Sequence, residues 1–292
     1  MRSKLFLCAA LAAGILLSGA APGKYLPCGY YDEKTFRRSV TLAEAYPREG
    51  KLCAGVVPHH LLAGKMIASF FAAAAEDGPY DTVLFVGPSH YPTGAGAVTT
   101  RSGWQTVFGP VENDLSLTAS LLGDRTLAAR TDDENMRLDH AVSGLIPYVG
   151  YYLPGAKVSA LLLENGLSPE RIQAAAERAA AAVLEEGKRV LLVCSIDFSH
   201  YLMPKEAVLR DEETRKAVEV FDYKTISRFT DSNMDSPQTM TVFLRTAEAR
   251  GIGEVTVFDH SSSDRILEAA SSDPAYREGT TTYFILGALA AD

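Results

Sequence analysis

Residues 82–91 read TVLFVGPSHY and residues 190–201 read VLLVCSIDFSHY, and these two stretches decide the predicted fold. Each begins with consecutive apolar residues, without the alternation expected of a strand that has one face in water. A strand with both faces covered has this composition, which is typical of a parallel sheet between layers of helices. We therefore predict an α/β fold with a largely parallel or mixed central sheet flanked by helices.

The rest of the chain alternates short apolar runs with alanine-rich segments of helical pattern. The predicted strands are 53–58, 82–87, 95–99, 157–163, 189–196, 254–258 and 281–286. The predicted helices are 61–75, 114–122, 139–148, 168–186, 205–221 and 237–249. Residues 23–52 are polar and irregular, and we predict a leader that packs on the surface. With no repeat or linker to divide it, we predict one domain over residues 23–292.

Residues 1–22 have the composition of an export signal. Arg2 and Lys4 precede an apolar run over residues 5–17, and the small residues at 18–21 suit cleavage. The apolar run is short for a membrane span, so a signal peptide is the first prediction and an uncleaved N-terminal membrane anchor the alternative. In both cases we expect the folded part to be secreted, periplasmic or otherwise extracytoplasmic.

Charge and cysteine content narrow the possible partners. The chain has 28 Lys and Arg against 36 Asp and Glu, a formal net charge of −8, which disfavours nucleic acid and anionic lipid. In an oxidising compartment Cys28 and Cys53 are candidates for a disulfide, whereas Cys194 lies in an apolar run and is predicted to be a buried thiol. The cysteine spacing does not indicate a cysteine-rich zinc site.

The positions of the six histidines are the main functional clue. His59, His90, His200 and His260 each follow a predicted strand. The carboxyl ends of strands in an open α/β sheet line its ligand crevice, and imidazole is the commonest metal ligand. We therefore predict a metal site at this edge of the sheet, with His59 and His90 as ligands. His260 is assigned to a loop or to the entry of a helix, and His60 is expected to point elsewhere.

Four segments, VVPHHLLAG (56–64), VLFVGPSHY (83–91), LDHAVSGLIPY (138–148) and VCSIDFSHY (193–201), occur in the order and spacing of a known family. Together they resemble the Memo-like family, which includes protein B of the AmmeMemoRadiSam system. That family is related in fold to the class III extradiol dioxygenases. The resemblance extends from residue 52 to the C-terminus. It implies an α/β fold with a metal pocket that contains His59 and His90.

The resemblance also points to the third ligand. The family usually has a cysteine there, and Asp235 stands at the matching position of this chain. With Asp235 the set becomes two histidines and one carboxylate, as in non-haem iron enzymes. A divalent metal is expected, with iron first and zinc, manganese or copper as alternatives. Asp235 also precedes a predicted helix, so capping of that helix is its alternative role.

Three further residues are predicted to handle protons. Asp197 and His200 are three residues apart in the IDFSH segment, and His140 opens a predicted helix. A histidine beside a carboxylate suits a general acid or base, and His200 is the first choice. Capping of a turn is the alternative role for Asp197.

The first functional hypothesis is an iron-dependent, oxidoreductase-like enzyme that acts on a small-molecule or peptide-like ligand. The second is a protein that binds a metal or ligand without catalysis on the same fold. The third is a zinc-dependent hydrolase. The substrate and the oligomeric state are not encoded in any pattern that we can identify.

Overall fold

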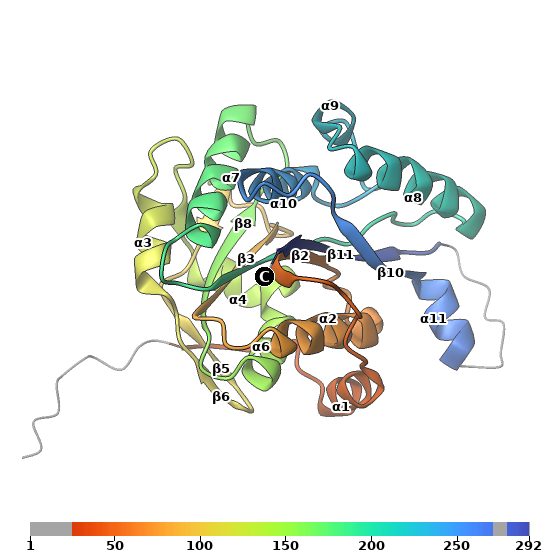
Figure 1. The fold of residues 1–292 in the computed structure, drawn as a ribbon, viewed down its shortest axis with the longest axis horizontal. Helices are drawn as coiled ribbons and strands as arrows, with labels where there is room; N and C mark the ends of the chain where they lie inside the picture. The colour runs from red at the N-terminus through yellow and green to blue at the C-terminus, as the bar shows by residue number, and fades with distance from the viewer. Residues whose placement is uncertain (1–24, 271–278, 292) are drawn as a thin grey trace, which may run out of the picture.

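The computed structural model of the chain describes residues 25–270 and 279–291. Its main sheet consists of β2 (Lys51–Val57), β3 (Thr82–Pro88), β4 (Ala97–Thr99), β7 (Arg130–Thr131), β8 (Lys157–Leu163), β9 (Val190–Ser195), β10 (Thr256–Ser262) and β11 (Thr282–Ala290). The strand order is β10-β11-β2-β9-β3-β8-β4-β7. Figure 1 labels β10, β11, β2, β3 and β8 of this sheet. The four central strands, β2, β9, β3 and β8, are parallel to one another. On one side β11 pairs antiparallel with β2 and β10 antiparallel with β11, and on the other side β4 pairs antiparallel with β8. This mixed sheet confirms the predicted fold class.

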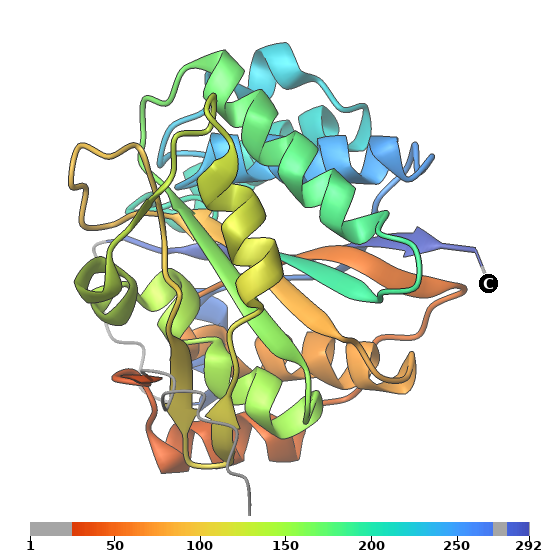
Figure 2. The ribbon, with the colours of Figure 1, turned by 90° about the vertical axis from the view of Figure 1, so that its left-hand side faces the viewer.

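Helices cover both faces of the sheet (Figures 1 and 2). One layer consists of α1 (Glu33–Leu42), α2 (Gly64–Glu76) and α6 (Ile146–Tyr152), and the other of α3 (Leu115–Gly123), α7 (Pro169–Val183) and α10 (Pro237–Ala249). The shorter or peripheral elements are η1 (Leu61–Ala63), α4 (Asp133–Leu138), α5 (His140–Ser143), α8 (Pro204–Glu219), α9 (Tyr223–Ile226) and α11 (Ser263–Ala270). A small sheet of β1 (Tyr25–Pro27), β5 (Gly103–Thr106) and β6 (Gly109–Val111) packs near α6.

The consecutive apolar residues of the central strands fill two separate cores. Along β3, Val83 and Phe85 pack in the core under α1 and α2, while Leu84 and Val86 pack in the core under α7 and α10. All four side chains are fully buried. Each such burial contributes about 1.5–3 kcal/mol, so a polar residue at any of them would weaken one helix layer. The sheet is therefore held from both sides, which fixes the positions of its strand ends.

Two predictions of local structure are wrong. The segment 23–52 is not irregular, because it contains α1, whose Phe36 is buried in the core. The predicted helix 139–148 is divided into α5 and α6 at Gly144 and Leu145. Pro147 has no N–H to continue the hydrogen-bond ladder back to Ser143, which explains the break.

His260 also differs from its predicted place in a loop. It lies within β10 and pairs with Phe284 of β11, because the antiparallel partner extends the strand to Ser262. His260 therefore lies at the far edge of the sheet, not beyond the carboxyl end of a parallel strand.

The predicted disulfide between Cys28 and Cys53 is not formed, and both thiols are free. Cys53 packs in the core under α7 and α10, whereas Cys28 packs against the core under α1 and α2. The sheet lies between the two side chains. Burial raises the pKa of the Cys53 thiol to about 11, so this thiol is unreactive at neutral pH.

In the described part of the chain no helix combines the length and the apolar character needed to cross a membrane. The predicted signal peptide or anchor at residues 1–22 lies outside the described residues.

Candidate metal centre

Three neighbouring parallel strands end at the same edge of the sheet. His59 lies two residues beyond β2, His90 two residues beyond β3, and Asp197 two residues beyond β9, which is the strand between them. Because adjacent strands are about 4.8 Å apart, the ends of β2 and β3 are roughly 10 Å apart. Two histidine side chains can meet across that distance, above the end of β9.

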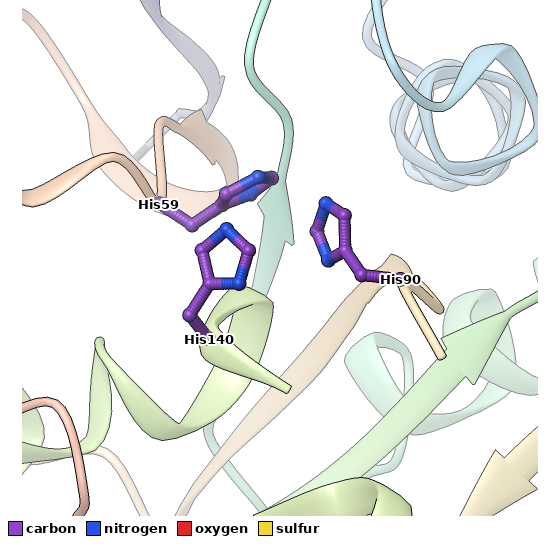
Figure 3. A group of neighbouring side chains, drawn as sticks. All are labelled: His59, His90 and His140. Carbon is purple, nitrogen blue, oxygen red and sulfur yellow. The ribbon is translucent and has the colours of Figure 1, made fainter. Parts of the chain in front are cut away.

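The rings of His59 and His90 do meet, and the ring of His140 from α5 joins them (Figure 3). The ring centroids lie 5.0 Å apart for His59 and His90, 4.9 Å for His59 and His140, and 4.3 Å for His90 and His140. One ring nitrogen from each residue lies within 4.8 Å of the other two. This group could hold a metal ion.

Two of the rings are held from behind by other side chains. Nδ1 of His59 lies 2.9 Å from Oγ of Ser195, the last residue of β9. Nδ1 of His90 lies 2.8 Å from Oδ1 of Asp139, whose Oδ2 accepts the His90 backbone N–H at 2.7 Å. The other ring nitrogen, Nε2, is then the one that each histidine can offer to a metal. Partners of this kind fix the tautomer and the orientation of metal-binding histidines.

Asp139 has a second task, because it is the N-cap of α5. Its Oδ1 accepts the N–H of Ala141 at 3.0 Å, and α5 begins with His140. One buried carboxylate therefore positions both His90 and the helix that carries His140. Burial opposes ionisation of Asp139, but the hydrogen bond and charge of His90 outweigh it and lower the pKa of the carboxyl.

Two further carboxylates approach His59. Its Nε2 lies 3.1 Å from Oδ2 of Asp235 and 3.6 Å from Oδ2 of Asp197. Asp197 also accepts the backbone N–H groups of His59 and His60 through Oδ1, at 3.1 and 3.4 Å. Asp197 thus fixes the backbone that follows β2.

The alternative role of Asp235 as a helix cap falls to its neighbour. Ser236 is the N-cap of α10, and its side chain accepts the N–H of Thr239. In the described chain Oδ1 of Asp235 is buried and has no hydrogen-bond partner. A buried carboxylate oxygen without a partner is costly unless a cation or a donor satisfies it.

The pKa values of the histidines reflect this crowding. Burial would lower the pKa of His59, but the charges of Asp197 and Asp235 and the hydrogen bond of Asp235 raise it to about 9. Burial and the neighbouring rings of His59 and His90 lower the pKa of His140 to about 4. The carboxylates around His59 therefore favour positive charge at its ring, whereas the ring of His140 is kept neutral.

The donor set fits a divalent metal. Among the ion pairs of the described residues, Asp139, Asp197 and Asp235 pair only with histidine rings. Donor atoms on adjacent positions of one metal, each about 2.1 Å from it, are roughly 3.0–3.4 Å apart. The 3.1 Å between Asp235 and His59 has that spacing. The role of Asp235 as a ligand nevertheless stays a prediction, because the group of three mutually close donors consists of the histidines.

His200 lies five residues beyond β9 and outside the three-histidine group. Its backbone N–H donates to the carbonyl of Asp231 at 2.8 Å, and its Nδ1 is buried with no partner in the described chain. Its catalytic role and that of Asp197 stay predictions. His140 lies among the possible ligands, and its predicted role in handling protons stays a prediction.

The other two histidines have partners elsewhere. Nδ1 of His60 lies 2.6 Å from the hydroxyl of Tyr283, and Nε2 of His260 lies 2.7 Å from Oδ2 of Asp211. His60 therefore points away from the centre, as its sequence position beside His59 suggested.

Asp139 and Ser195 are not among the site residues predicted from the sequence. The position of Asp139 does indicate a role, since an aspartate just before His140 at a helix start is a favoured N-cap. For Ser195 the apolar run VLLVCS offers none, because only the strand order shows that its hydroxyl meets His59.

The chain is thus an α/β protein with a histidine cluster that could hold a metal ion at the carboxyl edge of its parallel strands. A family model described as Memo-like protein matches residues 32–280. The chain belongs to the Memo-like family.

Individual relatives agree with this assignment. A MEMO1 family protein of Pyrobaculum arsenaticum is 29% identical over 221 residues, which cover 73% of this chain and 77% of the relative. One from Methanococcoides burtonii is 31% identical over 177 residues, covering 59% and 64%. Among solved structures, the uncharacterized protein JW3007 from Escherichia coli K12 matches with a TM-score of 0.51 and 14% identity. That match covers 80% of this chain and 98% of the other, and it supports the fold alone.

Proposed function

We propose that this chain is an extracytoplasmic, metal-dependent enzyme of the Memo-like family with a non-haem iron centre and oxidoreductase-like chemistry. The observation that carries the proposal is the convergence of His59, His90 and His140 at the carboxyl edge of the sheet. In the iron form, His59, His90 and Asp235 supply two imidazoles and one carboxylate. That set leaves positions open for substrate.

Iron is favoured by the donor atoms. Imidazole nitrogen and carboxylate oxygen bind iron and manganese well, whereas soft metals prefer thiolate ligands. The thiol of Cys194 is buried within β9 and is not among the donors of the site. Bound iron would supply redox chemistry and a template that orients the substrate. Ser195 and Asp139 hold the ligand rings, so their role is to keep Nε2 of each ring directed at the ion.

Proton handling is assigned to residues beside the ligands. Asp197 lies within 3.6 Å of His59, and His200 follows Asp197 by three residues. His200 has a buried ring nitrogen without a partner in the described chain, so it could exchange a proton with a bound ligand. His140 is the second choice for this role; its low pKa makes the ring a weak base, which suits a neutral hydrogen-bonding group beside the ligand.

A zinc-dependent hydrolase is a second candidate, because three imidazoles with an open fourth position are a known zinc set. The two candidates differ in their ligands. The iron centre requires Asp235, whereas the zinc centre requires His140. A non-catalytic protein that binds metal on this fold remains as the outcome in which neither activity is found.

The test begins with the metal content of the protein purified from its natural compartment. Protein stripped of metal is then loaded anaerobically with Fe(II) or with Zn(II), alongside His59→Ala as a control. Binding of nitric oxide to the iron form, followed by EPR, together with oxygen uptake that His59→Ala abolishes, is the expected result. Hydrolysis of ester or amide probes by the zinc form alone would support the second candidate, and absence of both activities with metal bound would overturn the enzyme proposal.

The location is tested separately. N-terminal sequencing of the mature protein and fractionation of the cells should place it outside the cytoplasm, with residues 1–22 removed or retained in the membrane. Recovery of the whole chain in the cytoplasmic fraction would overturn this part of the proposal.

A further inference from the structure

Two cavities each have one residue of the candidate metal centre in their walls. The first, of about 520 Å³, lies between the start of α7 and the segment before α10, and Asp235 is part of its wall. The second, of about 450 Å³, is open and has His90 in its wall, next to Tyr91 and Leu138. Each is large enough for part of a small molecule that reaches the centre.

The charges in the two walls have one sign. The cavity at Asp235 also has Asp231 in its wall, and the cavity at His90 has Asp132 and Glu134, of which Glu134 is paired with Arg137 at 2.6 Å. Among the described residues that line these cavities there is no Lys or Arg. Arg210 and Arg228 line a third cavity, by α8 and α9. This third cavity shares Phe229, Thr230 and Ser232 with the cavity at Asp235.

The remaining walls of the larger cavity are neutral. Leu167, Ile172 and Phe229 provide apolar surface, and the side-chain amide of Gln238 donates to Oδ1 of Asn165 at 2.9 Å. A phosphate or carboxylate group would meet Asp231 there, and no described Lys or Arg lines this cavity to compensate its charge. An ammonium group would be attracted by Asp231.

Resting on the metal centre proposed above, we propose that its ligand is a small molecule that is neutral or carries an ammonium group. The end of the ligand distant from the metal lies beside Asp231, in the cavity of about 520 Å³. Anionic substrates, including phosphorylated ones, are rejected at this cavity.

The test uses three catechols as probes, because the same diol chelates a metal in all of them while the substituent differs. Dopamine carries an ammonium group, 4-methylcatechol is neutral, and 3,4-dihydroxyphenylacetate carries a carboxylate. Binding to the metal-loaded full-length protein is measured in low salt. We expect dopamine to bind at least about tenfold more tightly than the carboxylate probe, with 4-methylcatechol between them. The difference should shrink at high salt.

Variants locate the effect. Asp231→Asn should reduce the preference for dopamine severalfold, and Asp231→Lys should reverse it. Glu186→Gln removes one exposed charge before β9, at the opposite edge of the sheet, and should leave the preference unchanged. Equal affinity for all three catechols, or a preference unchanged by Asp231→Lys, would overturn this inference while leaving the metal centre intact. If metal-loaded protein binds none of the catechols, the open metal positions of the proposed function are wrong and the inference falls with them.

Discussion

Asp139 holds His90 at two points, with Oδ1 2.8 Å from the ring Nδ1 and Oδ2 2.7 Å from the backbone nitrogen. Replacement of Asp139 by Asn removes the charge behind the ring and should lower metal affinity by about 10–100-fold. Competition with a chelator of known affinity measures this. Asp132→Asn is a matched control, because Asp132 caps α4 as Asp139 caps α5. Equal affinity of the Asp139 variant and wild type would contradict the predicted role.

The third ligand can be identified by comparing Asp235→Ala with His140→Ala. If iron is held by two histidines and one carboxylate, Asp235→Ala should lower the affinity for iron by more than the roughly 100-fold expected when a residue that only supports a ligand is lost. His140→Ala should retain iron and lose turnover. Elemental analysis after dialysis distinguishes them, and the reverse pattern would favour the three-histidine zinc centre.

Asp211 is predicted to be important for stability. It is buried on α8, its Oδ1 accepts the hydroxyls of Ser199 at 2.8 Å and Thr282 at 2.7 Å, and its Oδ2 lies 2.7 Å from His260. Asp211→Ala leaves these three groups without their acceptor and should cost about 2–4 kcal/mol in urea unfolding. The control Glu212→Gln changes the exposed neighbouring residue and should alter the free energy of unfolding by less than about 0.5 kcal/mol. A cost for Asp211→Ala as small as the control would show that the network does not stabilise the fold.

The contribution of Asp114 to stability should depend on pH. Burial tends to raise the pKa of this carboxyl, but the hydrogen bonds of Lys188 and Thr82 outweigh it and hold the pKa below its ordinary value of 3.8. The stabilisation is therefore complete above that value and is lost as the pH falls through the lower pKa of the folded state.

Asp114→Asn should consequently cost about 1–2 kcal/mol at pH 7, with the cost shrinking in acid below that pKa. Chemical unfolding at a series of pH values measures it. Glu185→Gln removes the exposed second partner of Lys188 and should have little effect at any pH. A cost for Asp114→Asn that is independent of pH would exclude the ionised form as its source.

The sequence predicted the central strands and two of the clustered histidines, because both depend on local pattern. Consecutive apolar residues identify a strand covered on both faces, and a histidine directly after such a strand lies at the ligand-binding edge. His59 and His90 satisfied both conditions, and the structure brings their rings together.

What the sequence missed depends on contacts between distant segments. The sequence allows a disulfide between Cys28 and Cys53, but the sheet lies between their side chains. His260 looked like a residue beyond a strand because the pairing with β11, which extends β10, cannot be read from local composition. The inclusion of His140 depends on α5, a short helix that begins with His140 and is separate from α6.

The position of β9 between β2 and β3 has a consequence for how the molecule opens. Since β2 and β3 are not neighbours in the sheet, the loops that carry His59 and His90 are joined to each other through their side chains and not by a main-chain ladder. A cation shared by His59, His90 and His140 would fasten the ends of β2 and β3 and the start of α5 at once. Metal supply would then set the melting temperature and the rate of amide exchange at this edge, and chelation would loosen these loops before the rest of the sheet.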